Sequence, residues 1–147
     1  MAILPLFTHP HPILRQRCQP VGMPDDQIRA LLKDMEDSLR FYRGVGLAAC
    51  QIGQPLRLIV VRRGHEMVKL VDPVILGTGG AQECQESCLS FPGLIADTLR
   101  PKLVTLRALN EWGEPVTITG RDELAQCLCH EMDHLDGILL PDRARGL

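Results

Sequence analysis

Two histidines four residues apart, the first followed by a glutamate, form the part of this chain best suited to chemistry. They lie in the run His130-Glu131-Met132-Asp133-His134. On a helix, side chains at this spacing lie one above the other, so both imidazoles can reach one metal ion. The glutamate carboxylate then lies where it can act on a water held by that ion. This combination predicts metal-assisted hydrolysis of a carbonyl compound.

The residues around the motif predict the helix that it needs. The run before it, residues 121–129, contains neither glycine nor proline, and Gly120 and Gly137 bracket the whole segment. Because glycine is common at helix boundaries, we expect one helix between them that presents both histidines on one face.

The third metal ligand is harder to identify. A hydrolytic metal site normally takes three protein ligands and leaves a further position for water or substrate. Zinc proteases commonly draw the third ligand from a downstream Glu or His, but neither residue type follows His134 here. The third ligand must therefore lie upstream. The candidates are a carboxylate, a cysteine, or one of His9, His11 and His65.

Length and charge predict one soluble domain over residues 1–147. The 16 Lys and Arg nearly balance the 18 Asp and Glu, and the chain has no basic stripe that would indicate a nucleic-acid partner. No apolar run reaches the ~20 residues of a membrane span, and the N-terminus lacks a signal-peptide pattern. We therefore expect a cytoplasmic protein. Its six cysteines are then expected to be free thiols, mostly buried, or metal ligands.

Hydrophobic spacing predicts an α+β fold rather than alternating strand–helix–strand units. Residues 1–22 are punctuated by proline and predicted to be extended. Apolar residues recur at helical spacing over 24–42, with Pro24 at the start and two aspartates in the first turn. Strands are predicted at residues 56–61, 68–71, 102–109 and 115–119. A hairpin turn at 110–113 is predicted to join the last two.

Three segments resemble the signature motifs of the peptide deformylases. They are Gly44-Val45-Gly46-Leu47-Ala48-Ala49-Cys50-Gln51, Glu86-Ser87-Cys88-Leu89-Ser90 and His130-Glu131-Met132-Asp133-His134-Leu135. Their order and the overall length match the family, and the resemblance runs from about Pro10 to Arg143. Three motifs in this order are far more specific than the histidine motif alone.

The resemblance implies small antiparallel or mixed β-sheets packed around a central metal-binding helix, with a further helix near the N-terminus. It implies that Cys88, His130 and His134 bind one metal ion per chain, natively iron(II), with zinc, nickel or cobalt as substitutes. A thiolate with two imidazoles suits several of these ions. The implied substrate is an N-formylated nascent peptide, which loses its formyl group by hydrolysis.

The resemblance also implies roles for residues around the ion. Glu131 is expected to act as general acid and base on the metal-bound water, while the Gln51 side-chain amide and the Leu89 backbone N–H hold the developing oxyanion. A strand-like pairing with the peptide backbone is implied for Val45, Gly46 and the segment around Glu86. Arg100 is expected near the outer residues of the peptide, and Cys127 at the pocket for the methionine side chain.

The chain departs from the usual family pattern beside two of these motifs. Ser87 replaces a glycine before the metal cysteine, which predicts backbone strain of about 1 kcal/mol if that position needs a glycine conformation. Cys50 replaces a proline, which is expected to loosen the loop that directs Gln51. Cys129 replaces a glutamine before the first metal histidine.

The predicted substrate pocket is unusually polar. Glu123, Gln126 and Cys127 lie on the near side of the helix, where the family has a largely apolar pocket for methionine. We expect activity on formyl-methionyl peptides to be retained but weakened or respecified. The chain also stops soon after Asp142, without the C-terminal helix of many bacterial members, so we expect at most a weak contact with the ribosome exit region.

Two other functions stay open at this point. A deformylase-like paralogue would keep the metal site but act on a different acylated amine. A non-catalytic, zinc-stabilised binding module would close the metal shell with cysteines such as Cys84, Cys127 and Cys129. Such a module would need neither Glu131 nor Gln51.

Overall fold

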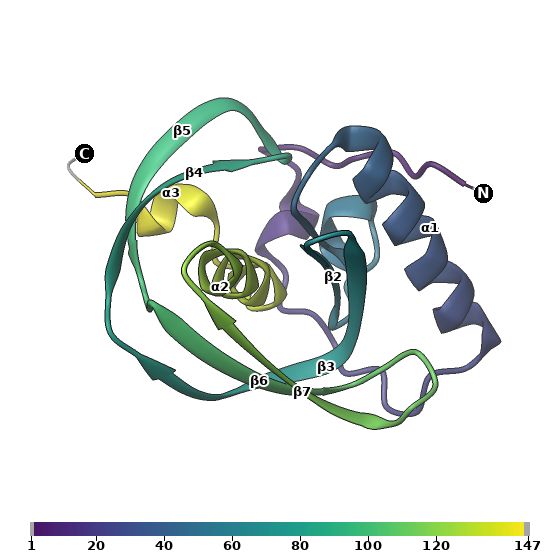
Figure 1. Cartoon of the computed structure of the whole chain (residues 1–147). Coiled ribbons are helices and arrows are strands. Elements are labelled where there is room, and N and C mark those ends of the chain that lie inside the picture. The colour runs from purple at the N-terminus through teal and green to yellow at the C-terminus, as the bar shows by residue number, and fades with distance from the viewer. Residues whose placement is uncertain (1, 146–147) are drawn as a thin grey trace.

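The computed structural model describes residues 2–145, in which two antiparallel sheets enclose one helix. That helix, α2 (Glu123–Leu135), carries the histidine motif and is seen nearly end-on at the centre of Figure 1. The larger sheet has the strand order β1-β2-β3-β6-β7, and β4 pairs with β5. The strands are β1 (Gly46–Ala48), β2 (Leu58–Arg63), β3 (Glu66–Gly79), β4 (Gln82–Cys88), β5 (Phe91–Arg100), β6 (Leu103–Leu109) and β7 (Pro115–Arg121). The expected α+β fold around a central helix is confirmed.

The first long helix, α1 (Asp26–Tyr42), packs outside the larger sheet against β1 and β2 (Figure 1). It begins after Asp25, whose Oδ1 accepts a hydrogen bond from the Ile28 N–H at 2.9 Å. It ends where Arg43 takes a left-handed conformation with φ 57°. The predicted helix at 24–42 is confirmed, with its start two residues later.

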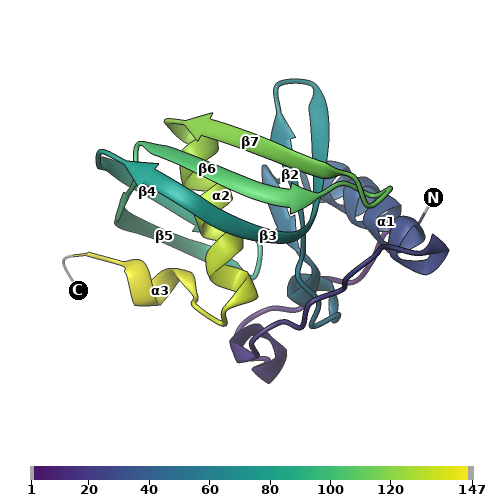
Figure 2. The same ribbon diagram turned by 90° about the horizontal axis from the view of Figure 1, so that it is seen from below.

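Packing on the sheets fixes the rotation of α2. Seen from below in Figure 2, strands β3, β6 and β7 lie side by side in front of this helix. Its apolar side, including Ala125, Leu128 and Leu135, is fully buried in the main core. Burial of a leucine side chain contributes about 2 kcal/mol, so turning the helix would be costly. The core therefore determines the direction in which both histidines point.

Glycine is required close to both ends of α2. A Cβ at Gly120 would come within 2.9 Å of the Leu124 and Leu128 side chains. Gly137 has φ 72°, and a Cβ there would lie 2.4 Å from the Arg15 carbonyl oxygen. The expectation of one helix between these two glycines is confirmed.

Two strands beside the site were not predicted from the sequence, namely β4 and β5. Their inward positions carry polar side chains among the apolar ones, including Glu86, Thr98 and Arg100. Because buried and exposed positions both carry polar residues, these strands lack the apolar–polar alternation by which a half-buried strand is recognised in a sequence. The predicted strands at 56–61, 68–71, 102–109 and 115–119 correspond to β2, β3, β6 and β7, of which β3 is much longer than expected.

The two ends of the described chain lie against this framework. The N-terminal part is extended as expected, apart from the single 3-10 turn η1 (Pro12–Arg15). The expectation that no C-terminal helix is present was wrong, because one helical turn, α3 (Leu140–Arg143), follows α2. Buried Leu140 holds this turn against the core cluster of Phe91 and Leu139. Within residues 2–145, no helix is long and apolar enough to cross a membrane.

Candidate metal centre

The structure brings Cys88, His130 and His134 together at the junction of the smaller sheet and α2. One ligand atom from each lies within 4.8 Å of the others, and Cys88 Sγ is 3.4 Å from His134 Nε2. Cys88 ends β4, whereas the two histidines are one helical turn apart on α2. The third candidate ligand, left open by spacing alone, is therefore the cysteine Cys88. His9, His11 and His65 are exposed and lie outside this cluster.

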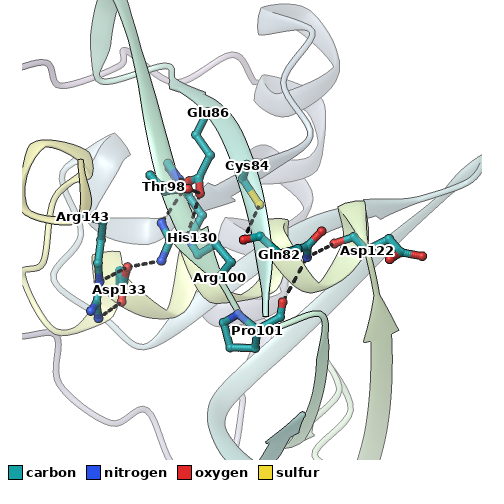
Figure 3. A network of polar contacts seen from close by, with 10 residues as sticks. All are labelled: Gln82, Cys84, Glu86, Thr98, Arg100, Pro101, Asp122, His130, Asp133 and Arg143. Carbon is teal, nitrogen blue, oxygen red and sulfur yellow. Dashed lines mark hydrogen bonds and ion pairs between the residues drawn. The ribbon is translucent and has the colours of Figure 1, made fainter. Parts of the chain in front are cut away.

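The orientation of His130 is set by Glu86, which reaches it from β4. His130 Nδ1 donates to Glu86 Oε1 at 2.9 Å, and this leaves Nε2 as the ligand atom. Glu86 also accepts from Thr98 Oγ1 and from two atoms of Arg100, Nε at 2.7 Å and Nη2 at 3.0 Å. Figure 3 shows these side chains converging on the carboxylate.

A second carboxylate extends this network to the end of the described chain. Arg100 Nη1 donates to Asp133 Oδ2 at 2.6 Å, and Arg143 on α3 donates to both Asp133 oxygens at 3.0 and 2.9 Å (Figure 3). Asp133 therefore binds two arginines and is not part of the metal cluster. Arg100 is only 4% exposed and does not line the groove that opens over the cluster. The geometry thus gives no support to the expected contact between Arg100 and the outer residues of a peptide.

On its Nδ1 side, His134 is held by packing and not by a polar partner. It is 1% exposed, and its Nδ1 atom has no hydrogen-bond partner among the described residues. Burial, followed by the nearby charges of His130 and Arg100, lowers the pKa of His134 to about 3. The imidazole is therefore neutral at pH 7, the form that binds metal ions.

Glu131 lies within the site without a hydrogen-bond partner for its buried Oε1 atom in the described part of the chain. Burial raises its pKa to about 7; the charge of His130 opposes this shift and that of Glu86 adds to it. Gly46 on β1 makes room for the carboxylate, since a Cβ there would lie 2.5 Å from Glu131 Oε2 and 2.8 Å from Cys127 Sγ. Such a group is suited to exchanging a proton near neutral pH.

A groove of about 670 Å³ opens over these residues. Its walls include most of the residues singled out from the sequence: Val45, Gly46, Gln51, Glu86, Leu89, Glu123, Gln126, Cys127, His130 and Glu131. Arg43, Arg62 and Arg63 add positive charge to the rim. The polar lining expected from Glu123 and Gln126 is therefore present in the groove.

The unusual residues leave the site intact. Ser87 is not among the described residues with positive φ, so the strain expected there is not found. Cys50 is buried in the 3-10 turn η2 (Ala49–Ile52), and Gln51 beside it is 1% exposed and held by hydrogen bonds. Cys129 packs in the main core, and burial raises its pKa to about 11.

The residues fit a single metal ion with an open position. A thiolate and two imidazoles are the ligands of zinc, iron and related ions, and no fourth ligand joins the cluster in the described part of the chain. Burial is also the largest cause that raises the pKa of Cys127, so this neighbouring thiol stays protonated. Within residues 2–145, the candidate cluster therefore has three protein ligands and not the four of a closed structural site.

Sequence reasoning missed the supporting residues Thr98 and Ser90. Thr98 lies on an unpredicted strand, and no local pattern marks it. Ser90 lies within the quoted Glu86–Ser90 segment, and its polarity directly after Leu89 is the signal that could have identified it. The structure buries both side chains completely or nearly so and places hydrogen bonds on each.

Comparisons with known proteins agree with this site. The family model described as polypeptide deformylase matches residues 3–147. Peptide deformylase 2 of Clostridium acetobutylicum is 48% identical over 131 residues, which are 88% of this chain and 87% of that relative. The crystal structure of peptide deformylase from Thermotoga maritima has a TM-score of 0.96 at 31% identity, covering 99% of this chain and 100% of that one.

A third comparison includes a bound peptide. The Met-Ala-Ser-bound structure of peptide deformylase from Acinetobacter baumannii has a TM-score of 0.91 at 28% identity, covering 97% of this chain and 98% of that one. The whole described fold, with the helix of the histidine motif at its centre, is thus shared with these enzymes. The chain belongs to the polypeptide deformylase family.

Proposed function

We propose that this enzyme removes the N-terminal formyl group from formyl-methionyl nascent peptides, with Glu131 as general acid and base. One observation carries the proposal: the buried Glu131, whose Oε1 has no hydrogen-bond partner among the described residues, lines the same groove as the Cys-His-His cluster. Family membership supports the metal-dependent, formyl-removing activity. The relative bound to Met-Ala-Ser supports a peptide that begins with methionine.

Cys88, His130 and His134 would hold one divalent ion, which we propose to be iron(II), with zinc, nickel or cobalt as working substitutes. When bound, the ion supplies Lewis acidity, which lowers the pKa of water and polarises the formyl carbonyl. Glu86 fixes the ring of His130 through the 2.9 Å hydrogen bond to Nδ1. A hydrogen-bonded carboxylate also makes an imidazole a better electron donor.

Glu131 is proposed to move the proton. Its carboxylate takes a proton from the attacking water, and the same oxygen then gives that proton to the leaving amine as the C–N bond breaks. The pKa of about 7 matches both steps at neutral pH, because the donor and acceptor forms are both well populated. Gly46 allows the carboxylate to approach the backbone of β1 closely.

The developing negative charge falls on the formyl oxygen. We propose that the Gln51 Nε2 amide and the Leu89 N–H donate to it, each contributing about 3 kcal/mol to barrier lowering. Both residues line the groove beside Cys88. Their donors come from separate segments, the 3-10 turn η2 and the turn between β4 and β5.

The peptide backbone is proposed to lie along β1. This strand is at the edge of the larger sheet, so one side of it is open to a further strand. Val45, directly before β1, is 61% exposed, and its backbone together with that of Gly46 lies in the groove wall. Bonds to the backbone are independent of side chains, which suits an enzyme that acts on many nascent proteins. Action on nascent chains places the enzyme in the cytoplasm, with any contact at the ribosome exit region testable by co-sedimentation.

A variant of this function is favoured by the polar groove. Glu123 and Gln126 line the wall next to Cys127, where a methionine side chain is expected to bind. Because burying a carboxylate or amide against a thioether is unfavourable, the preference for formyl-methionine should be weaker than in an apolar pocket. Steady-state rates on formyl-Met, formyl-Leu and formyl-Gln tripeptides test this, and a strong preference for methionine would remove the variant.

The test of the main proposal is deformylation of formyl-Met-Ala-Ser by anaerobically purified, iron-loaded protein. We expect turnover that disappears in Glu131→Ala while one ion per chain stays bound. Activity in Glu131→Ala equal to that of the wild type would rule out the assigned role. No turnover by an iron-loaded wild type, together with activity on other acylated amines, would identify a paralogue with an altered substrate.

A further inference from the structure

The N-terminal segment holds together the two loops that carry the proposed oxyanion donors. Phe7 N–H donates to the Gln51 carbonyl at 2.7 Å, and His9 N–H donates to the Ser90 carbonyl at 2.8 Å. Ser90 Oγ in turn donates to the Phe7 carbonyl at 2.8 Å. Residues 7–9 therefore connect the turn η2 to the segment that follows Cys88, far away in sequence.

The Gln51 side chain is held at both ends of its amide. Its Oε1 accepts from the Ala48 N–H at 2.9 Å, and its Nε2 donates to Ser90 Oγ at 3.1 Å. The Ala48 N–H is only a donor, so it determines which end of the amide is the oxygen. Both side chains are buried, Gln51 at 1% and Ser90 at 0% exposure.

The Ser90 hydroxyl has one hydrogen, and that hydrogen goes to the Phe7 carbonyl. Its oxygen is therefore the acceptor in the bond with Gln51. The amide nitrogen carries two hydrogens, of which Ser90 takes one. The other points to the metal ligands, where Nε2 donates a long hydrogen bond to Cys88 Sγ at 3.8 Å. A hydroxyl that both accepts and donates also polarises the chain of bonds from Gln51 to Phe7.

We propose that Ser90 is a positioning residue, which directs the second N–H of Gln51 toward the reacting formyl oxygen. This inference rests on the proposed role of Gln51 in the deformylation reaction. Without the Ser90 acceptor, the amide loses the shorter of its two Nε2 hydrogen bonds, while the bond from Ala48 and the long bond to Cys88 Sγ remain. Ser90 itself does not touch substrate and acts only through Gln51.

A double-mutant cycle with Gln51 tests this role. Gln51→Ala removes the donor and should lower kcat by about 10²–10³-fold. Ser90→Ala leaves the donor but releases it, so we expect kcat to fall about tenfold, with KM nearly unchanged. If Ser90 acts through Gln51, adding Ser90→Ala to Gln51→Ala should lower kcat by less than about twofold. Metal content per chain is measured for every variant.

Ser38 provides a matched control for the loss of a buried hydroxyl. It is also 0% exposed, accepts from the Leu4 N–H at 2.9 Å and donates to the Asp34 carbonyl at 2.7 Å, but it lies on α1. Ser38→Ala should reduce thermal stability as Ser90→Ala does and leave kcat unchanged. Should Ser90→Ala fail to fold, Ser90→Cys keeps the shape with a weaker acceptor and enters the same cycle.

The outcomes separate this inference from the proposed function. Wild-type turnover on formyl-Met-Ala-Ser is measured first, and its absence would count against the function. With an active wild type, an equal loss from Ser90→Ala in both backgrounds, or an unchanged kcat, would overturn the role of Ser90. Loss of the metal ion in Ser90→Ala would also overturn it, because the residue would then act through Cys88.

Discussion

Two buried glutamates near His130, Glu86 and Glu131, differ in their hydrogen-bond partners and in the direction of their pKa shifts. Each is 3% exposed. Glu86 receives hydrogen bonds from His130, Arg100 and Thr98, and these outweigh burial and lower its pKa to about 2. Glu131 has an unpartnered Oε1 in the described chain, and burial raises its pKa to about 7. Hydrogen-bond partners offset the effect of burial on the pKa of Glu86, whereas for Glu131 the effect of burial prevails.

This difference assigns a separate task to each carboxylate. Glu86 stays ionised at all ordinary pH values, so it can orient His130 but cannot exchange protons. Glu131 changes its protonation state near pH 7, so it can exchange protons but holds nothing in place. At active sites, two carboxyl groups whose surroundings give them very different pKa values usually have different roles in acid–base chemistry. The same comparison applies to the histidines, because His130 has a carboxylate partner and His134 is held by packing.

The largest expected effect comes from Glu131→Gln. This change keeps the shape of the side chain but removes its proton exchange, so kcat should fall by about 10²–10⁴-fold. The metal content should remain at one ion per chain, because Glu131 is not a ligand in the cluster. Steady-state rates on formyl-Met-Ala-Ser and metal analysis check both points. Glu114→Gln, an exposed change in the hairpin turn, is the control with wild-type activity.

The same Glu-to-Gln change should alter stability with opposite signs at the two positions. In chelator-treated protein at pH 8, Glu131→Gln removes a buried, poorly paired charge and should raise the free energy of unfolding by about 3 kcal/mol. Glu86→Gln removes a well-bonded charge and leaves Arg100 less well paired, so it should lower that free energy by about 3 kcal/mol. Urea denaturation measures both, and shifts of the same sign would contradict the comparison.

The pH dependence of stability follows from the same pKa values. The pKa of Glu131 is raised from 4.5 to about 7, so its contribution to stability is present below pH 4.5 and lost as pH rises to about 7. The pKa of Glu86 is lowered from 4.5 to about 2, so its contribution is present above pH 4.5 and lost as pH falls to about 2. Glu131→Gln should therefore remove the loss of stability between pH 4.5 and 7 in the chelator-treated protein.

A smaller effect is expected on metal binding when Glu86 is changed. In Glu86→Gln the ring of His130 loses its charged partner, which should weaken metal affinity by about 10–100-fold. Competition with a chelator of known affinity measures this change. Glu83→Gln, on the same strand but with an exposed side chain, serves as the control. Equal affinities in the two variants would mean that packing alone orients His130, as it does His134.

How far the sequence predicts this molecule depends on what each residue contacts. The motif of His130 and His134 lies on a helix with ordinary apolar spacing, so spacing was sufficient to predict both the helix and its boundaries. α1 was predicted for the same reason. The strands β2, β6 and β7 also follow from their apolar residues. In these elements burial and hydrophobicity coincide, and local pattern is informative.

The pattern fails where the buried face is built for the site. On β4 and β5 the inward residues include Glu86, Thr98 and Arg100, whose burial is compensated by one another and by His130. These partners are 12 to 44 residues apart in sequence, so no local window reveals them. The resemblance alone suggested that Arg100 lies near the peptide, whereas the structure pairs it with Glu86 and Asp133.

The smallest predicted effect lies at the exposed end of this network, at Arg143. Its side chain is 46% exposed, so its ion pair with Asp133 should contribute only about 0.2–1 kcal/mol. Arg100 binds the same carboxylate at 4% exposure, and removing it would leave Glu86 and Asp133 buried with one partner fewer. Arg143→Ala should therefore lower thermal stability slightly and leave metal affinity unchanged, whereas Arg100→Ala should lower both. A loss of metal affinity in Arg143→Ala comparable to that in Arg100→Ala would mean that α3 also determines the orientation of His130.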